Sequence, residues 1–358
     1  MRRAVFAAAC LWIAGTAQAQ ESTGIKAYSK FDFVPGATII AYDDVAPDAV
    51  GDFPAGWNTT ASGEVVTIEG KPGQRLMFTK GGIFLPELRA TLPDNFTLEF
   101  DLLASTTFTT GTDFSVNIVA LPKINVPAGW QGADDRFTFT ANPSGVSRSD
   151  KRQAGTGEAA VEAQAEPFGA QSGGLVHVSV WRQKERLRVY LDQQKVWDVP
   201  KAMVATVKYN SILFYVYDAA PDYMYYLTNL RLAVGAPDAR NKLLTEGKWV
   251  THGILFDVNS DQIKGTSYGT LKEIASVMKE NPALKVKIIG YTDSDGDAAA
   301  NLELSKKRAA AVKNALVTEF GIDAARMETD GRGASQPVDK NDTAAGKANN
   351  RRVEFVKM

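Results

Sequence analysis

The chain has 358 residues, of which 44% are hydrophobic, and this length and composition favour two globular domains with ordinary cores. Its 40 lysines and arginines balance 41 aspartates and glutamates, so the formal net charge is −1. This balance excludes a polycationic chain, and we predict no nucleic-acid partner.

The first residues have the three parts of a secretory signal peptide. Arg2-Arg3 is basic, residues 4–15 are apolar, and Ala17-Gln18-Ala19 supplies the small residues that precede a cleavage site. The apolar run is too short to span a bilayer. We therefore expect residues 1–19 to be removed and the mature protein to be exported.

Cys10 is the only cysteine in the chain. An alternative interpretation makes it a lipid-modified residue after Ala7-Ala8-Ala9, but this leaves too short an apolar segment before it. With cleavage after Ala19, the mature protein contains no cysteine and therefore no disulfide.

Residues 25–235 are typical of an all-β domain. Short apolar or alternating runs recur between turns rich in Pro, Gly, Asn and Asp, and no long amphipathic helix interrupts them. In the run Leu175–Trp181, Val176 and Val180 face one way and His177 the other. This pattern predicts a sandwich or a barrel. The hairpins from Leu175 to Val199 resemble those of concanavalin-like and laminin-G-like sandwiches, so we expect a jelly-roll or concanavalin-like sandwich.

Residues 141–174 separate two blocks of predicted strands. They are rich in Gly, Ala, Ser, Gln and Glu. We expect a long surface insertion here, and the sequence does not decide whether it is ordered.

A paired-carboxylate pattern raises the question of catalysis. Glu99 and Asp101 project from one face of a predicted strand, as glycoside hydrolysis requires of its two carboxylates. A laminarinase-like pattern needs a further Glu three residues after Asp101, where Ala104 stands. Strand alternation explains the pair, and likewise His177, as an outward polar face. We therefore predict no catalytic residue, no metal and no cofactor.

Residues 236–247 form the predicted linker, with a short helix over 238–246. Residues 248–358 then alternate strands and helices. The predicted strands are 249–257, 285–291, 326–329 and 352–356, and the predicted helices are 266–280 and about 298–320. This order predicts an α+β domain with two helices on one face of a small sheet.

The strongest functional pattern lies between Gly290 and Arg308. A buried strand ends in a polar turn that carries Asp293 and Asp295, and a helix follows. Asn301 and Arg308 are seven residues apart and so project from nearly the same face of that helix. A carboxylate and a guanidinium on two sides of a crevice suit a zwitterionic ligand.

Four motifs in this order resemble the OmpA-like peptidoglycan-binding domain family. They are Gly253–Ser260, Thr292-Asp293 with Gly296, Asn301–Ala309 and Asn350–Val353. The resemblance covers residues 248–358. One departure is Tyr291, where the family usually has His.

The resemblance implies a ligand and a set of binding residues. Asp293 and Arg308 correspond to the pair that holds the diaminopimelate of the peptidoglycan stem peptide. Asn259, Asn301 and Arg351 match supporting positions. Asp295 falls at a more variable position.

We therefore expect a non-enzymatic protein of a Gram-negative periplasm that is associated with the cell wall. Its sandwich would engage a second partner, either a glycan, an envelope protein or the outer membrane. Two alternatives are a wall-tethered glycan hydrolase and an outer-membrane β-barrel with a wall-binding tail. The barrel is disfavoured because most strands are shorter than about ten residues. Arginines also lie within several of them, at Arg75, Arg188 and Arg231.

Overall fold

The structure is a computed structural model. It describes residues 31–358 apart from 88–91, 106–113, 124–134, 154–155, 158–160, 166, 168–173, 220–222 and 236–237. The predicted signal peptide, with Cys10, lies outside the described residues. Residues 31–358 form one compact unit.

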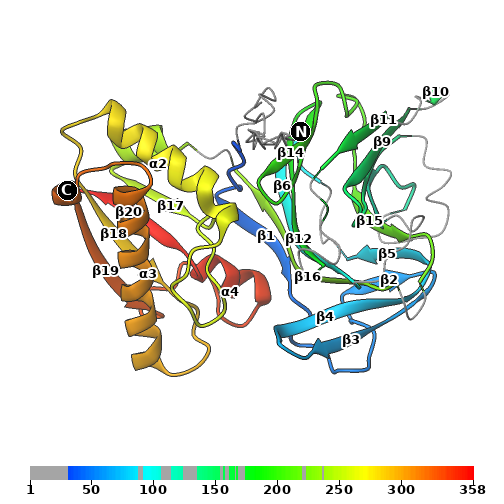
Figure 1. Cartoon of the computed structure of the whole chain (residues 1–358), viewed down its shortest axis with the longest axis horizontal. Helices are drawn as coiled ribbons and strands as arrows, with labels where there is room; N and C mark the ends of the chain where they lie inside the picture. Colours follow the sequence, from blue (N-terminus) through cyan, green and yellow to red (C-terminus); the bar gives the residue numbers. More distant parts are fainter. Residues whose placement is uncertain are drawn as a thin grey trace, which may run out of the picture. The chain divides into compact units, whose positions relative to one another are not determined.

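Two antiparallel sheets make up the described part of the chain before residue 235 (Figure 1). The first sheet contains β1 (Thr38–Asp43), β3 (Ser62–Ile68), β4 (Lys71–Lys80), β6 (Asn95–Ala104), β12 (Leu175–Gln183), β13 (Arg186–Leu191), β14 (Gln194–Val199) and β16 (Tyr225–Val234). The second contains β2 (Trp57–Thr59), β5 (Gly82–Pro86), β7 (Phe114–Val119), β8 (Arg136–Ala141), β9 (Val146–Gln153), β10 (Thr156–Gly157), β11 (Val161–Gln164) and β15 (Ser211–Val216). The predicted β-rich N-terminal region is thereby confirmed.

The apolar faces of the two sheets pack into one core. Val178 of β12 pairs with Phe100 of β6, and both side chains are fully buried. The ring of Phe100 lies 6.2 Å from that of Phe114 in β7 and 5.2 Å from that of Phe214 in β15. Each such buried side chain contributes about 1.5–3 kcal/mol to folding. The period-two alternation that predicts β12 therefore places its valines correctly, as Val176, Val178 and Val180 are all in this core.

The region predicted as a surface insertion contains strands. β9 pairs with β8, and β11 pairs with β9. The inward positions of β9 are filled by Ser147 and Ser149, both buried, and Trp197 Nε1 donates a hydrogen bond of 2.8 Å to Ser147 Oγ. Serines at buried positions leave no hydrophobic alternation, which explains why the sequence pattern does not reveal this strand.

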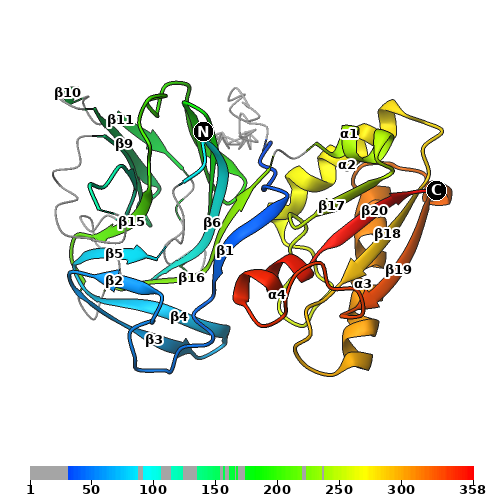
Figure 2. The same cartoon turned by 180° about the vertical axis from the view of Figure 1, so that it is seen from behind.

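The C-terminal part is an α+β domain, as predicted. Its sheet has the order β17 (Lys248–Thr251), β20 (Val353–Lys357), β18 (Val286–Tyr291) and β19 (Met327–Gly333). Its helices are α1 (Ala239–Thr245), α2 (Tyr268–Glu280), α3 (Ala298–Thr318) and α4 (Ala344–Asn350). Helices α2 and α3 cover one face of the sheet (Figure 2). The first strand ends at Thr251 rather than at residue 257, and an isolated bridge joins Phe256 to Ile263.

A second core lies between this sheet and its helices. The predicted stripe of α2, Leu271, Ile274, Ala275 and Met278, is buried in it. The predicted linker is partly integrated into the same core, because Ala239 and Leu243 of α1 are fully buried there. None of the helices in the described ranges is both long and apolar enough to cross a membrane.

Gly290 of β18 permits close contact between the sheet and α3. A Cβ built at this position would overlap the backbone oxygen of Ser305 and lie 3.2 Å from its carbonyl carbon. Because the obstacle is helix backbone, we expect Gly290→Ala to lower the free energy of unfolding by about 2–3 kcal/mol. Gly56→Ala is the control, since its nearest neighbour would be 3.9 Å away. Urea unfolding with equal losses in both variants would contradict this packing.

Hydrogen bonds join β1 to α4 within the compact unit. The Ile39 backbone N–H donates to Asn349 Oδ1, and Asn349 Nδ2 donates to the Ile39 carbonyl, both at 3.0 Å. Arg231 Nη1 of β16 donates to the carbonyl of His252 at 2.8 Å. These contacts position β1 and β16 beside the pocket described next.

Candidate functional site

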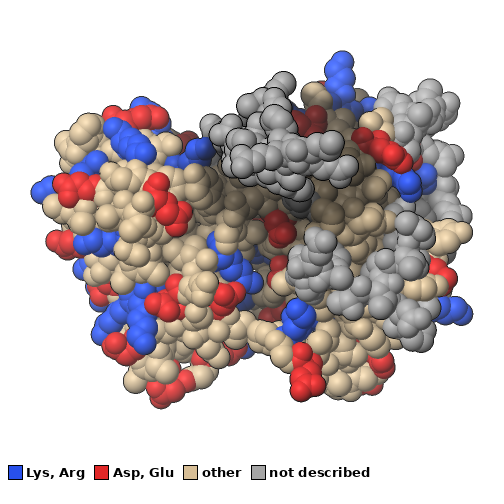
Figure 3. All heavy atoms as spheres, viewed as in Figure 1, with Lys and Arg blue, Asp and Glu red and all other residues tan. Residues whose placement is uncertain are grey.

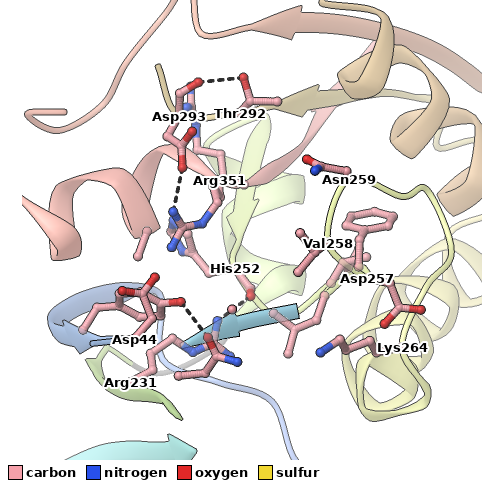
Figure 4. Close-up of a pocket in the computed structure, with 18 of the residues that line it drawn as sticks. Asp44, Arg231, His252, Asp257, Val258, Asn259, Lys264, Thr292, Asp293 and Arg351 are labelled. Atoms are coloured by element: carbon pink, nitrogen blue, oxygen red, sulfur yellow. Dashed lines mark hydrogen bonds and ion pairs between the residues drawn. The ribbon is translucent and has the colours of Figure 1, made fainter. Parts of the chain in front are cut away.

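A pocket of about 480 Å³ lies between the first sheet of the sandwich and the α+β domain. Side chains from several segments line it (Figure 4). All six binding residues predicted from the sequence are among its lining residues: Asn259, Asp293, Asp295, Asn301, Arg308 and Arg351. Pockets of this size accommodate a ligand larger than a single amino acid.

Asp293 lies two residues after the end of β18 and is buried. Its Oδ2 accepts a hydrogen bond of 2.6 Å from Arg351 Nη1, and its Oδ1 accepts from the backbone N–H of Asp295 at 3.1 Å. Figure 4 shows the Asp293–Arg351 ion pair inside the pocket. The carboxylate is therefore held in one orientation, with lone pairs left over on both oxygens.

Arg308 projects from the third turn of α3. Its Nε donates to the carbonyl of Ser260 at 2.9 Å, and its guanidinium carbon lies 4.9 Å from the centre of the Phe256 ring. Burial lowers the pKa of Arg308 from its ordinary value, but the side chain remains a cation. Within the described ranges, no carboxylate lies within 4 Å of this guanidinium.

The other predicted residues shape the turn and the rim. Asn301 Nδ2 donates to the carbonyl of Asp295 at 2.8 Å and so closes the turn before α3. Asp295 itself is exposed and pairs with Lys347 at 2.8 Å. Asn259 is exposed in the loop beside Phe256, with a φ of +53°, a conformation that Asn adopts more readily than most residues.

The sandwich supplies lining residues that the sequence patterns do not indicate. Tyr42 of β1 lies under Arg351, with the guanidinium carbon 5.0 Å from the ring centre. Asp44, which follows β1, also lines the pocket (Figure 4). No sequence signal links Tyr42 to Arg351. Phe256 had a signal, because it lies within the first of the four motifs.

Glu99, Asp101 and His177 point away from the sandwich core, as predicted, but they are not a solvated face. Glu99 is 3% exposed, and its Oε2 forms an ion pair with Arg231. His177 Nδ1 lies 2.7 Å from Asp101 Oδ1, and its Nε2 lies 3.4 Å from Glu99 Oε1. Arg231, which lies on the same sheet in β16, donates to the carbonyl of His252 and so joins this face to the α+β domain. We call Glu99, Asp101, His177 and Arg231 the buried charge cluster.

The charges in this cluster stabilise one another. Burial alone would lower the pKa of His177, but hydrogen bonds to Asp101 and Glu99 raise it to about 9. Burial opposes ionisation of Asp101, yet His177 lowers the pKa of this carboxyl to about 2. The pKa of Glu99 is also lowered, against burial, by Arg231 and His177. A general acid in glycoside hydrolysis needs a raised carboxyl pKa, so this pair is unsuited to that role.

Charges of both signs are interspersed on the face shown in Figure 3. The described residues form no extended basic patch on that face. This distribution agrees with the balanced composition of the chain.

The strand, turn and helix around Asp293 and Arg308 define the class of domain. Residues 255–351 match the OmpA family, and the C-terminal third of the chain is an OmpA family domain. The family match leaves the sandwich uncovered.

Two curated proteins illustrate the similarity. One is "Probable lipoprotein YiaD" of Escherichia coli (strain K12), 46% identical over 105 residues, which are 29% of this chain and 48% of that protein. Another is "Outer-membrane lipoprotein YfiB" of Pseudomonas aeruginosa, 40% identical over 103 residues, which are 29% of this chain and 61% of that protein. The chain thus spans about half the length of these relatives.

Among solved structures, the peptidoglycan-associated lipoprotein from Burkholderia pseudomallei is 33% identical. The match covers 29% of this chain and 88% of that one, with a TM-score of 0.28.

Proposed function

We propose that the protein is a cell-envelope protein that binds peptidoglycan non-covalently through the diaminopimelate of the stem peptide. The OmpA family domain and its similarity to a probable lipoprotein and to an outer-membrane lipoprotein support an envelope location. The signal-peptide pattern at residues 1–19 supports export, and the OmpA family domain suggests that the destination is a Gram-negative periplasm. In this proposal the protein anchors to the wall and is not an enzyme.

The observation that carries the proposal is Arg308, a cation in the pocket whose hydrogen bonds to the described residues all go to backbone carbonyl groups. The free end of the diaminopimelate side chain carries an ammonium beside a carboxylate. Arg308 would take the carboxylate through its guanidinium fork, and Asp293 would take the ammonium with its remaining lone pairs. Asn259 and Asn301 would support this arrangement with their amides and by shaping the loops, and Arg351 would hold Asp293. Asp295 would act at the rim.

For the sandwich we propose a concanavalin-like arrangement that engages a second partner, either a glycan or an envelope protein. Its two packed antiparallel sheets are compatible with this type of fold. By binding this partner through the sandwich, the protein would link the wall to another component of the envelope, such as the outer membrane.

We expect Arg308→Ala to weaken binding of the full chain to diaminopimelate-type sacculi by about 2 kcal/mol, or roughly thirtyfold in Kd, because it removes the partner of the ligand carboxylate. Asp293→Ala should have a comparable effect through the ammonium. Co-sedimentation at graded sacculus concentrations measures both, and circular dichroism confirms folding.

Two controls sharpen this test. Glu303→Ala removes an exposed carboxylate of α3 that pairs with Lys306 and does not line the pocket, and it should change binding little. Lysine-type sacculi lack the side-chain carboxylate, so the wild-type chain should bind them weakly. Unchanged sedimentation of folded Arg308→Ala protein would overturn the proposal.

A further inference from the structure

We propose that the sandwich is part of the peptidoglycan site, with Tyr42 as a positioning residue that holds Arg351 and, through it, Asp293. This inference rests on the proposed function and extends it to residues outside the OmpA family domain. It assigns the wall of the pocket opposite α3 to strands β1 and β16.

The first step is the contact between Tyr42 and Arg351. The guanidinium carbon of Arg351 lies 5.0 Å from the centre of the Tyr42 ring, while its Nη1 donates to Asp293 at 2.6 Å. An aromatic face attracts a guanidinium at this distance. Arg351 is thus held from two sides, by an aromatic ring of the sandwich and by a carboxylate of the α+β domain.

The second step is the support behind Tyr42. Its hydroxyl donates to Asn229 Oδ1 at 3.0 Å, and Asn229 Nδ2 donates to Asp101 Oδ2 at 2.7 Å. Asp101 in turn contacts His177 in the buried charge cluster. Tyr42 is therefore fixed by a chain of hydrogen bonds that leads into the first sheet.

The third step is the backbone that places Asn229. The pairing of β16 with β6 shifts register between Thr228 and Arg231, and Asn229 has a φ of +55°. Irregularities of this kind redirect side chains and are frequent beside binding and active sites. Here the irregularity brings Asn229 to the pocket, where it reaches both Tyr42 and Asp101.

The consequence concerns the ammonium end of the ligand. Arg351 occupies one oxygen of Asp293 in a single geometry, which leaves the remaining lone pairs for a ligand ammonium. Without the Tyr42 ring, the guanidinium would be free to form a two-point pair with Asp293 and so compete with the ligand. Pre-organisation of this kind increases affinity without a new contact to the ligand.

The experiment measures the Kd of a stem tripeptide that contains diaminopimelate, by calorimetry with the full chain. We expect Tyr42→Ala to raise the Kd about fivefold to tenfold. Tyr42→Phe keeps the ring over Arg351 but loses the hydrogen bond to Asn229, so it should raise the Kd less than Tyr42→Ala does. In the Arg351→Ala background, Tyr42→Ala should cause no further loss, because the residue acts through Arg351. A general structural role would give additive losses.

Tyr268→Ala is the matched control. It also removes a ring with a cation over it, since Lys272 Nζ lies 5.9 Å from the ring centre, but Tyr268 is outside the pocket. If Tyr42→Ala does not fold, Tyr42→Leu replaces it, because it keeps bulk without an aromatic face. Wild-type affinity in the folded Tyr42 variant, beside a loss in Arg308→Ala, would overturn this inference alone. Wild-type affinity in both variants would overturn the proposed function as well.

Discussion

Replacing Glu99 with alanine is expected to lower the free energy of unfolding by about 3–5 kcal/mol. Glu99 is 3% exposed and is paired with Arg231, whose side chain is 7% exposed, and with His177. Alanine would leave these two cations in a buried environment with less compensating charge. This loss exceeds the net contribution of the ion pairs to stability, because Arg231 and His177 stay buried and desolvated after Glu99 is removed. Urea unfolding at neutral pH, followed by tryptophan fluorescence, measures it.

Glu162→Ala is the matched control for this experiment. Glu162 pairs with Arg148 at 2.8 Å, but both side chains are at least half exposed, so its removal should cost less than about 1 kcal/mol. Glu99→Gln keeps the shape of the side chain and loses the charge, and it should give an intermediate result. Equal and small losses in the Glu99 and Glu162 alanine variants would show that the cluster is solvated.

The parts of the site that could be predicted are those encoded by local sequence. The strand before Asp293, the turn and the helix that carries Arg308 lie within about twenty residues, and their spacing fixes which side chains share a face. The buried stripe of α2 and the buried valines of β12 were likewise predictable from the spacing of nearby residues. The order of the four motifs then assigned Asn259 and Arg351 to the same predicted site, although hydrophobic periodicity alone does not connect them to Asp293.

The parts that could not be predicted depend on contacts between distant segments. Strand alternation correctly places Glu99 and His177 outside the sandwich core, but it cannot show that another part of the chain covers them. Tyr42 and Arg351 are 309 positions apart, and neither carries a local signal for the other. The strand β9 was missed for a different reason, because serines replace the expected apolar residues at its buried positions.

The stability of the chain should fall by about 3 kcal/mol as the pH rises from 6.5 to about 9. The pKa of His177 is about 9 in the folded state, above the ordinary value of 6.5. Below pH 6.5 both states hold the proton, and the contribution is complete. Between the two values the unfolded state loses its proton while the folded state keeps it, so stability declines, and above about pH 9 the contribution is absent.

The alkaline loss can be assigned to His177 by substitution. Urea midpoints at about pH 6 and about pH 9.5 should differ in the wild type and converge in His177→Gln, which has no titrating ring. His252→Gln is the matched control: burial, with Arg231 and Arg352 nearby, lowers the pKa of His252 to about 4, so this residue is neutral throughout the window. The lowered pKa of Asp101 reflects the same ion pair from the carboxylate side, and its effect appears only as the pH falls from 3.8 to about 2. A wild-type midpoint that is constant from pH 6 to 9.5 would mean that His177 is not held as a cation between Asp101 and Glu99.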